Sequence, residues 1–189
     1  AGVEHLQRTR RGYPSAEAMN KRKAHTLVLA LGNDLLGDDG VGLEAARQIA
    51  GQVNGSVDVV ESGEAGLALL ELLEGYERAL LIDSIATGRY PPGTVLELCP
   101  EHFRRVIAPS PHYAGLPEVL EMARRLNLVF PQDIRILAME VQNPYEFRIG
   151  FSEPVQEALP RLVQRALQIL NAQNELPQNT ACAGTSNMT

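Results

Sequence analysis

A short apolar run that breaks at a glycine- and aspartate-rich turn and continues as a helical pattern constrains the fold more than any other part of the chain. This stretch is Thr26 to Ala50, TLVLALGNDLLGDDGVGLEAARQIA. Thr26 to Leu31 is too short for a buried helix and ends on turn residues, so it predicts a strand buried on both faces. From Val41 onward, apolar residues recur mostly at spacings of three and four, which predicts a helix. A strand that leads into a helix through a polar loop begins a βαβ unit, and ligands of open parallel sheets bind at the carboxyl ends of the strands.

Strand and helix patterns alternate through the rest of the chain. Further strands are predicted at Val57 to Glu61, Ala79 to Ile82, Thr94 to Leu98 (at an edge of the sheet) and Ile134 to Val141, and further helices at Ala65 to Leu73, Leu116 to Leu126 (with Leu126 facing inward) and from a Ser152 cap through Leu170. Pro160 lies inside the last helical pattern and predicts a kink or a late start there. The alternation predicts an α/β fold: a three-layer sandwich with a mostly parallel twisted sheet and helices on both faces.

The charge is distributed unevenly and predicts one domain with two flanking segments. Residues 1–25 carry a net charge of +4, whereas the chain as a whole carries −6. We expect a basic flexible leader over 1–25, because no apolar run of signal-peptide length follows it. A single α/β domain is expected over 26–171, and the polar segment 172–189 is expected to be a disordered tail.

Composition also excludes several function classes. A net charge of −6 argues against a nucleic-acid binder, which normally has a basic surface. No segment approaches the length of apolar chain needed to span a bilayer, so no membrane insertion is expected. Two cysteines are too few for a disulfide framework, and a cytoplasmic location fits best.

The residues best suited to chemistry are two carboxylates and one imidazole in three separate segments. Asp39 lies in the loop after the first strand, Asp83 follows the third predicted strand, and His112 lies in the loop SPHYAG. Together they could hold a divalent cation and leave positions open for a substrate, as a working metal site needs. Taken singly, an Asp after a strand is often a helix N-cap, and a loop His is usually an ordinary hydrogen-bonding residue.

Other catalytic patterns are weaker or absent. The glycines of the first loop do not form GxGxxG or GxxxxGK[ST], and the acids Asp38 and Asp39 would repel a phosphate, so a nucleotide-binding protein is disfavoured. There is no G-x-S-x-G elbow and no HExxH. Cys99 and His102 have a C-x-x-H spacing, but without a second pair they give little support for zinc.

Four segments resemble, in order, the nickel-iron hydrogenase maturation endopeptidases. They are LALGNDLLGDDGVG, ALLIDSIATG, SPHYAGLPEVLEMARRL and EVQNPYEFRIGFSEPVQEAL, which lie between Leu29 and Leu159. The first segment, a G-N-x-L-x-x-D-[DE]-G-x-G pattern after a strand, is the most specific. The chain departs from the family at Ala30, where members usually have glycine. Because alanine is also small, this departure is minor.

The resemblance implies an enzyme, a metal-dependent endopeptidase, that removes a C-terminal extension from the hydrogenase large-subunit precursor after nickel insertion. It implies that Asp39, Asp83 and His112 bind the metal, and that Asn33 and Asp38 support the loop that presents Asp39. The nickel is expected to come with the substrate, and zinc or cadmium could substitute in the site. We also expect the loop glycines to let a protein tail approach the backbone.

One alternative uses the same three ligands. A non-catalytic, chaperone-like module could recognise the nickel-loaded large subunit without cutting it. Release of a C-terminal peptide would distinguish the protease from such a binder.

Overall fold

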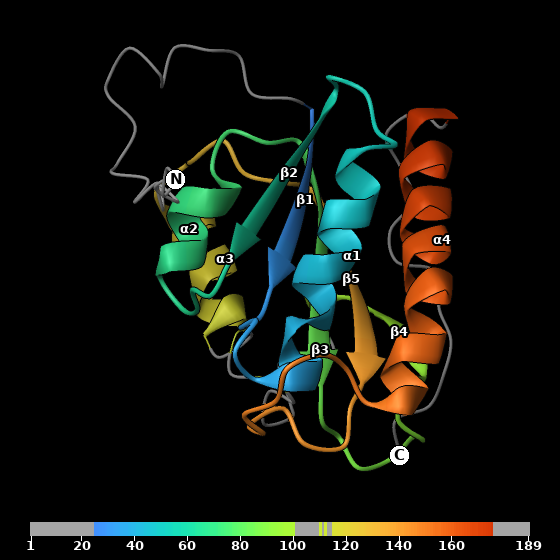
Figure 1. Cartoon of the computed structure of the whole chain (residues 1–189). Coiled ribbons are helices and arrows are strands. Elements are labelled where there is room, and N and C mark those ends of the chain that lie inside the picture. Colours follow the sequence, from blue (N-terminus) through green and yellow to red (C-terminus); the bar gives the residue numbers. More distant parts are fainter. Residues whose placement is uncertain (1–24, 101–109, 111, 113–114, 176–189) are drawn as a thin grey trace, which may run out of the picture.

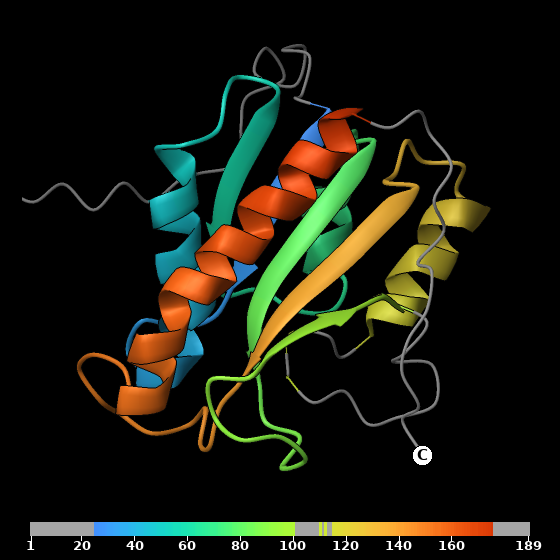
Figure 2. The same ribbon diagram turned by 90° about the vertical axis from the view of Figure 1, so that its right-hand side faces the viewer.

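The core of the computed structural model is a sheet whose strand order is β2-β1-β3-β5-β4 (Figures 1 and 2). The structure describes residues 25–100, 110, 112 and 115–175. Within them the strands are β1 (Thr26–Leu31), β2 (Val57–Ser62), β3 (Arg78–Ile85), β4 (Val95–Leu98) and β5 (Asp133–Glu140). The first three strands and β5 pair in parallel, and β4 runs antiparallel to β5 at one edge. The predicted mostly parallel sheet and its edge strand are therefore confirmed.

Helices cover both faces of the sheet, as Figure 1 shows. They are the 3-10 helix η2 (Gly37–Gly40) and the α-helices α1 (Val41–Ala50), α2 (Ala68–Leu73), α3 (Leu116–Arg125) and α4 (Glu153–Glu175). Apolar side chains of α1 and α4 pack on one face of the sheet, and those of α2 and α3 pack on the other. The predicted α/β three-layer sandwich is confirmed.

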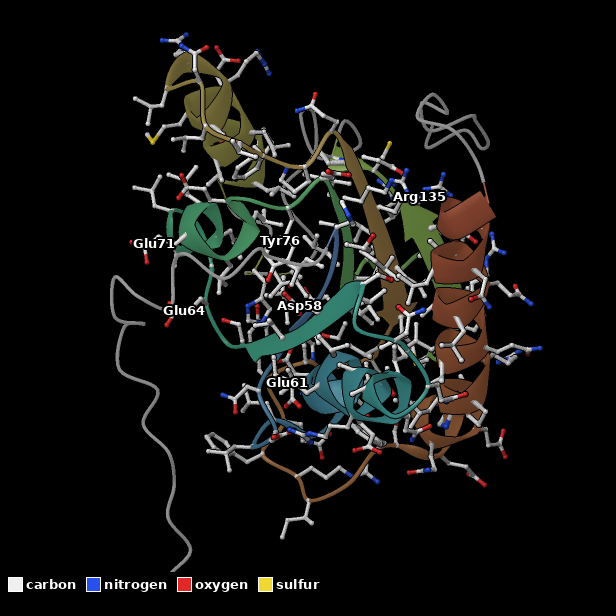
Figure 3. The ribbon with its side chains drawn as sticks, turned by 90° about the horizontal axis from the view of Figure 1, so that it is seen from above. Asp58, Glu61, Glu64, Glu71, Tyr76 and Arg135 are labelled. Atoms are coloured by element: carbon white, nitrogen blue, oxygen red, sulfur yellow. The ribbon has the colours of Figure 1, made fainter. Side chains whose placement is uncertain are left out.

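Strand β1 is the centre of this arrangement. All six of its residues are buried, as the uninterrupted apolar run predicted, and it pairs with β2 on one side and β3 on the other. Beside it, the Tyr76 hydroxyl donates a hydrogen bond of 2.9 Å to the Asp58 carboxylate and ties β2 to the segment before β3 (Figure 3). Burial and this hydrogen bond raise the pKa of Tyr76. Within the described residues, no helix combines the length and apolar character needed to cross a bilayer.

Two predicted boundaries are wrong in ways that affect the site. Strand β3 does not end at Ile82 but continues to Ile85, so Asp83 lies within the strand rather than after it. The reason is β5, which continues far enough to pair with Asp83 and the two residues after it. Helix α2 begins at Ala68 rather than Ala65, because Gly66 has a φ of 59°, which no right-handed helix accommodates.

The ends of α3 and α4 also differ from the sequence prediction. Leu126 is 58% exposed rather than inward, because α3 ends at the residue before it. Helix α4 begins at Glu153 and continues through Pro160, so the predicted late start is wrong. Burial of Val155 and its neighbours against the sheet holds these first turns. The helix continues past residue 171 to Glu175, since no glycine or proline interrupts it, whereas the leader 1–24 and residues 176–189 lie outside the described residues.

Candidate metal site

Asp39 lies on η2, the 3-10 turn between β1 and α1. The residue is only 4% exposed, and its side-chain Oδ1 accepts a hydrogen bond of 2.9 Å from the Ser84 hydroxyl. A glycine makes this turn possible: a Cβ at Gly32, whose φ is 146°, would lie 2.2 Å from the Asp39 carbonyl oxygen. The turn therefore folds back onto the end of β1 and presents Asp39 to β3.

Gly42 brings the first turn of α1 against the same strand ends. A Cβ there would lie 2.6 Å from the carbonyl oxygen of Ile82 and 2.7 Å from that of Leu31. The expectation that the loop glycines admit a substrate is therefore wrong for Gly42, because the chain's own backbone occupies the space beside it, whereas Gly32 lines the pocket and for it the expectation stays a prediction.

Asp83 is fully buried in β3 beside this turn. Its Oδ1 accepts a hydrogen bond of 2.7 Å from the Ser84 backbone N–H, and its Oδ2 accepts one of 2.7 Å from the Ser110 hydroxyl. Burial raises the pKa of Asp83 to about 7, although the charge of His112 and the Ser110 hydrogen bond act in the opposite direction. A cation bound beside Asp83 would stabilise its ionised carboxylate.

His112 supplies the third side chain and is 7% exposed. Its Nδ1 lies 3.1 Å from the backbone carbonyl oxygen of Glu64, which can only accept, so Nδ1 carries a proton. Its Nε2 faces the acids and lies 3.9 Å from Asp39 Oδ2. Burial lowers the pKa of His112, but the Asp39 and Asp83 carboxylates raise it more, to about 9. The imidazole is thus oriented with Nε2 toward the two carboxylates.

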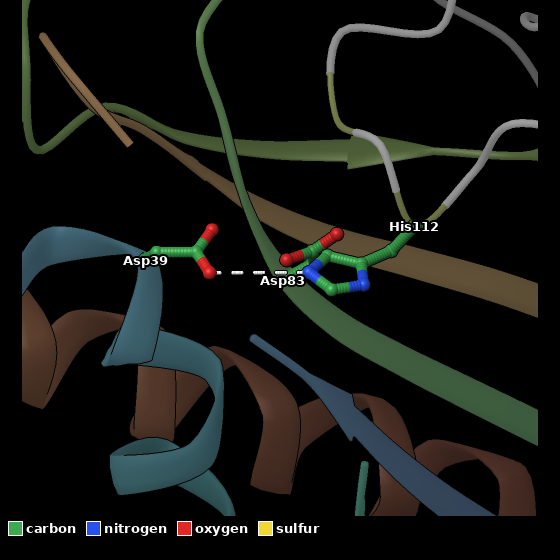
Figure 4. Close-up of side chains that lie close together, drawn as sticks. All are labelled: Asp39, Asp83 and His112. Carbon is green, nitrogen blue, oxygen red and sulfur yellow. Dashed lines mark ion pairs between the residues drawn. The ribbon is translucent and has the colours of Figure 1, made fainter. Parts of the chain in front are cut away.

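The structure brings together the three residues that the sequence singled out. Figure 4 shows their side chains pointing toward one another. One ligand atom from each of Asp39, Asp83 and His112 lies within 4.8 Å of the other two. Each side chain also has a hydrogen-bond partner outside the cluster: Ser84 donates to Asp39, Ser110 donates to Asp83, and His112 donates to the Glu64 carbonyl. Such partners orient metal ligands. Two carboxylates and an imidazole that has released its Nε2 proton fit a divalent cation such as nickel or zinc.

A pocket of about 420 Å³ opens over this cluster. Asp39 and His112 line it together with residues of the loop after β1 and of the loop after β5, whereas Asp83 is not part of its wall. The two open ligands face a space large enough for a segment of peptide. Among the described residues that line the pocket, none is a serine, threonine or cysteine.

The two residues expected to support the site lie outside the ligand cluster. The Asn33 side chain accepts a hydrogen bond of 3.0 Å from the Leu35 N–H and forms a local turn in the pocket wall. Asp38 is buried and accepts hydrogen bonds from the backbone N–H (2.6 Å) and hydroxyl (2.7 Å) of Ser152. Ser152 precedes α4, and its hydroxyl donates to Asp38. Asp38 therefore joins η2 to the beginning of α4.

Sequence reasoning missed the outer partners Ser84, Ser110 and the Glu64 carbonyl. Both serines stand within two residues of a predicted ligand, which was the only signal available. Their partners depend on how η2 approaches β3, which no local pattern encodes. The weaker zinc candidate Cys99 is buried, and His102 lies outside the described residues.

Sequence comparisons agree on one family. A sequence model described as "Hydrogenase maturation protease" matches residues 43–169, a range that includes Asp83 and His112 and begins after Asp39. The hydrogenase 2 maturation protease of Escherichia coli K12 is 27% identical over 76% of this chain and 89% of its own length. The hydrogenase expression/formation protein HupD of Rhizobium leguminosarum is 24% identical over 77% of this chain and 74% of its own.

Solved structures with the same fold carry related names. The hydrogenase maturating endopeptidase HybD of Escherichia coli superposes with a TM-score of 0.68 at 26% identity, covering 79% of this chain and 93% of that one. The [NiFe] hydrogenase maturation protease HybD of Thermococcus kodakarensis gives a TM-score of 0.60 at 26% identity, covering 77% and 98%.

The fold, the pocket and the similarity to known proteases show that the protein is a hydrolase built on an α/β sandwich. Within that class, the chain belongs to the hydrogenase maturation protease family. This membership favours the protease over the non-catalytic binder that uses the same ligands.

Proposed function

We propose that the protein is an endopeptidase that removes the C-terminal extension of the nickel-iron hydrogenase large-subunit precursor after nickel has been inserted, and that it acts in the cytoplasm. The observation that carries the proposal is the cluster of Asp39, Asp83 and His112, which is buried, held by outer hydrogen bonds and open to a pocket. The nickel belongs to the substrate. In nickel-loaded precursor, the side chains of the pocket can bind the nickel ion. Nickel-free precursor has no ion for them to bind.

The chemistry of the pocket favours attack by water. No serine, threonine or cysteine lines its described wall, and the nearby Ser84 and Ser110 hydroxyls donate to the carboxylates. Water therefore forms the new C–O bond to the scissile carbonyl as the C–N bond breaks, and a water proton passes to the leaving amine. The enzyme residues position the metal-bearing segment of the substrate, so that the scissile peptide is held for attack.

A processing assay tests this proposal. Purified precursor from the same cell is incubated with the enzyme in nickel-loaded and nickel-free form, and the released C-terminal peptide is detected by mass spectrometry. We expect release from loaded precursor only. Loss of the His112 imidazole (His112→Ala) or of the Asp39 carboxylate (Asp39→Ala) should reduce the rate at least a hundredfold, on the order of what positioning contributes.

His25→Ala is the matched control, because His25 is exposed and pairs with Glu77 at the amino end of β1, the end of the strand away from the cluster. It should process precursor at the parent rate. If His112→Ala and Asp39→Ala kept the parent rate, the proposed role of the cluster would be abandoned. Binding of loaded precursor without any released peptide would instead identify a non-catalytic binder.

A further inference from the structure

Four large apolar side chains are exposed beside the pocket, and we call them the rim patch: Leu35, Tyr145, Phe147 and Ile149. Their exposed fractions are 65%, 67%, 83% and 103%. Leu35 belongs to the loop after β1, and the other three belong to the loop between β5 and α4. Figure 1 shows these two loops side by side at the carboxyl end of the sheet. Exposed apolar side chains that gather at one place mark interaction surfaces.

The rim patch is continuous with the pocket but extends beyond it. Leu35 and Tyr145 line the pocket together with Asp39 and His112, whereas Phe147 and Ile149 are outside its wall. A peptide bound in the pocket therefore touches Leu35 and Tyr145. Phe147 and Ile149 lie where the body of a protein whose tail entered the pocket could contact them.

The loop that carries the patch is fixed to the turn that carries Asp39. Leu36 and Arg148 form a parallel β-bridge, and a Cβ at Gly37 would lie 3.0 Å from the Arg148 Cβ. At the end of the loop, the backbone and hydroxyl of Ser152 donate to Asp38, the neighbour of Asp39. The patch therefore has a fixed position relative to the metal ligand, and a partner bound to it is placed in register with the pocket.

We propose that the rim patch docks the folded body of the large-subunit precursor, next to the point where its C-terminal extension emerges. This inference rests on the proposed function. A protein occupant fits the patch better than a membrane surface, because the charged neighbours Glu146 and Arg148 have opposite signs and the whole chain carries −6. Phe147 is the kind of exposed aromatic anchor that dominates protein interfaces.

The test removes the apolar side chains without altering the pocket. The double variant Phe147→Ser/Ile149→Ser should raise KM for nickel-loaded precursor about tenfold or more and leave kcat within about twofold, since these side chains contribute binding and no chemistry. The Kd for nickel-free precursor should rise by the same factor, because the folded body is present in both forms. Phe147→Leu/Ile149→Val, which keeps the surface apolar, should retain most of the parent affinity.

The matched control is Leu126→Ser/Val129→Ser. These residues are 58% and 68% exposed, but they lie between α3 and the start of β5, at the amino ends of the parallel strands and away from the pocket. Their KM and Kd should equal those of the parent. Parent KM and Kd in Phe147→Ser/Ile149→Ser would overturn the docking surface while leaving the protease assignment intact. Patch-dependent binding without cleavage would overturn the proposed function and leave the docking surface standing.

Discussion

Each ligand side chain is oriented by a second residue, and this pairing has measurable consequences at the scale of single residues. Ser84 bridges two acids, since its hydroxyl donates to Asp39 and its backbone N–H donates to Asp83. Ser110 donates to the other oxygen of Asp83. Among the described residues, three of the four carboxylate oxygens accept a hydrogen bond from a serine, and the fourth, Asp39 Oδ2, faces His112.

Removing either serine hydroxyl should weaken the site while leaving the fold intact. In Ser84→Ala or Ser110→Ala, a carboxylate loses the hydrogen bond that fixes its orientation, so affinity for an added divalent cation and the processing rate should each fall about 10–100-fold. The free energy of unfolding should fall by about 1–3 kcal/mol, because a buried acceptor is left unpaired. Zinc titration calorimetry and urea unfolding measure the two effects.

Ser56→Ala is the matched control for these serine variants. The Ser56 hydroxyl bonds only to nearby Asn54, in an exposed turn before β2. This variant should bind zinc with parent affinity. Equal zinc affinity in Ser84→Ala, Ser110→Ala and the parent would show that the serines do not orient the ligands.

At the scale of elements, the close approach of α1 to the ends of β1 and β3 determines where η2 and Asp39 lie. Gly42→Ala would place a methyl group 2.6 Å and 2.7 Å from two backbone carbonyl oxygens. Helix α1 must then move away from the sheet, which should cost about 1–3 kcal/mol of stability and displace Asp39 from Asp83. The urea midpoint and the processing rate should both fall.

Gly51, at the C-terminal end of the same helix, provides the control for the Gly42 variant. Gly51 has a φ of −78°, and a Cβ there would meet nothing within 4 Å. Gly51→Ala should therefore have the parent stability or gain about 0.4–1 kcal/mol from the less flexible unfolded chain. If Gly42→Ala were as stable and as active as Gly51→Ala, the packing at Gly42 would not be what positions Asp39.

The elements and ligands that sequence could predict are those with a local signature. The uninterrupted apolar run of β1 and the helical spacing after Val41 are local, and with the alternation of strands and helices they predict the sandwich. The choice of Asp39, Asp83 and His112 came from the resemblance to the family, because single acids near strands and single loop histidines are common. The extension of β3 through Asp83 depends on pairing with β5, a distant segment. The partners of Ser84 and Ser110 depend on the same three-dimensional packing, so no pattern in the sequence predicts them.

At the scale of the whole molecule, the cluster joins three distant parts of the chain: η2, β3 and the loop before α3. A cation bound there binds the folded state and has no preformed site in the unfolded state. At a free concentration about a hundred times its Kd, it should add about 2.7 kcal/mol to the free energy of unfolding. For a chain of this size that corresponds to a rise in Tm of about 5–11 °C.

Thermal unfolding with added zinc or nickel measures this stabilisation, and a chelator should reverse it. His112→Ala removes one of three ligands and should lose most of the shift, whereas His25→Ala should retain it, because His25 lies at the amino end of β1, away from the cluster. A shift of equal size in His112→Ala would mean that the metal stabilises the protein from a different site. Absence of any shift in the parent would mean that the cluster binds a cation only when the substrate contributes the remaining ligands, and that outcome would contradict the prediction for added metal.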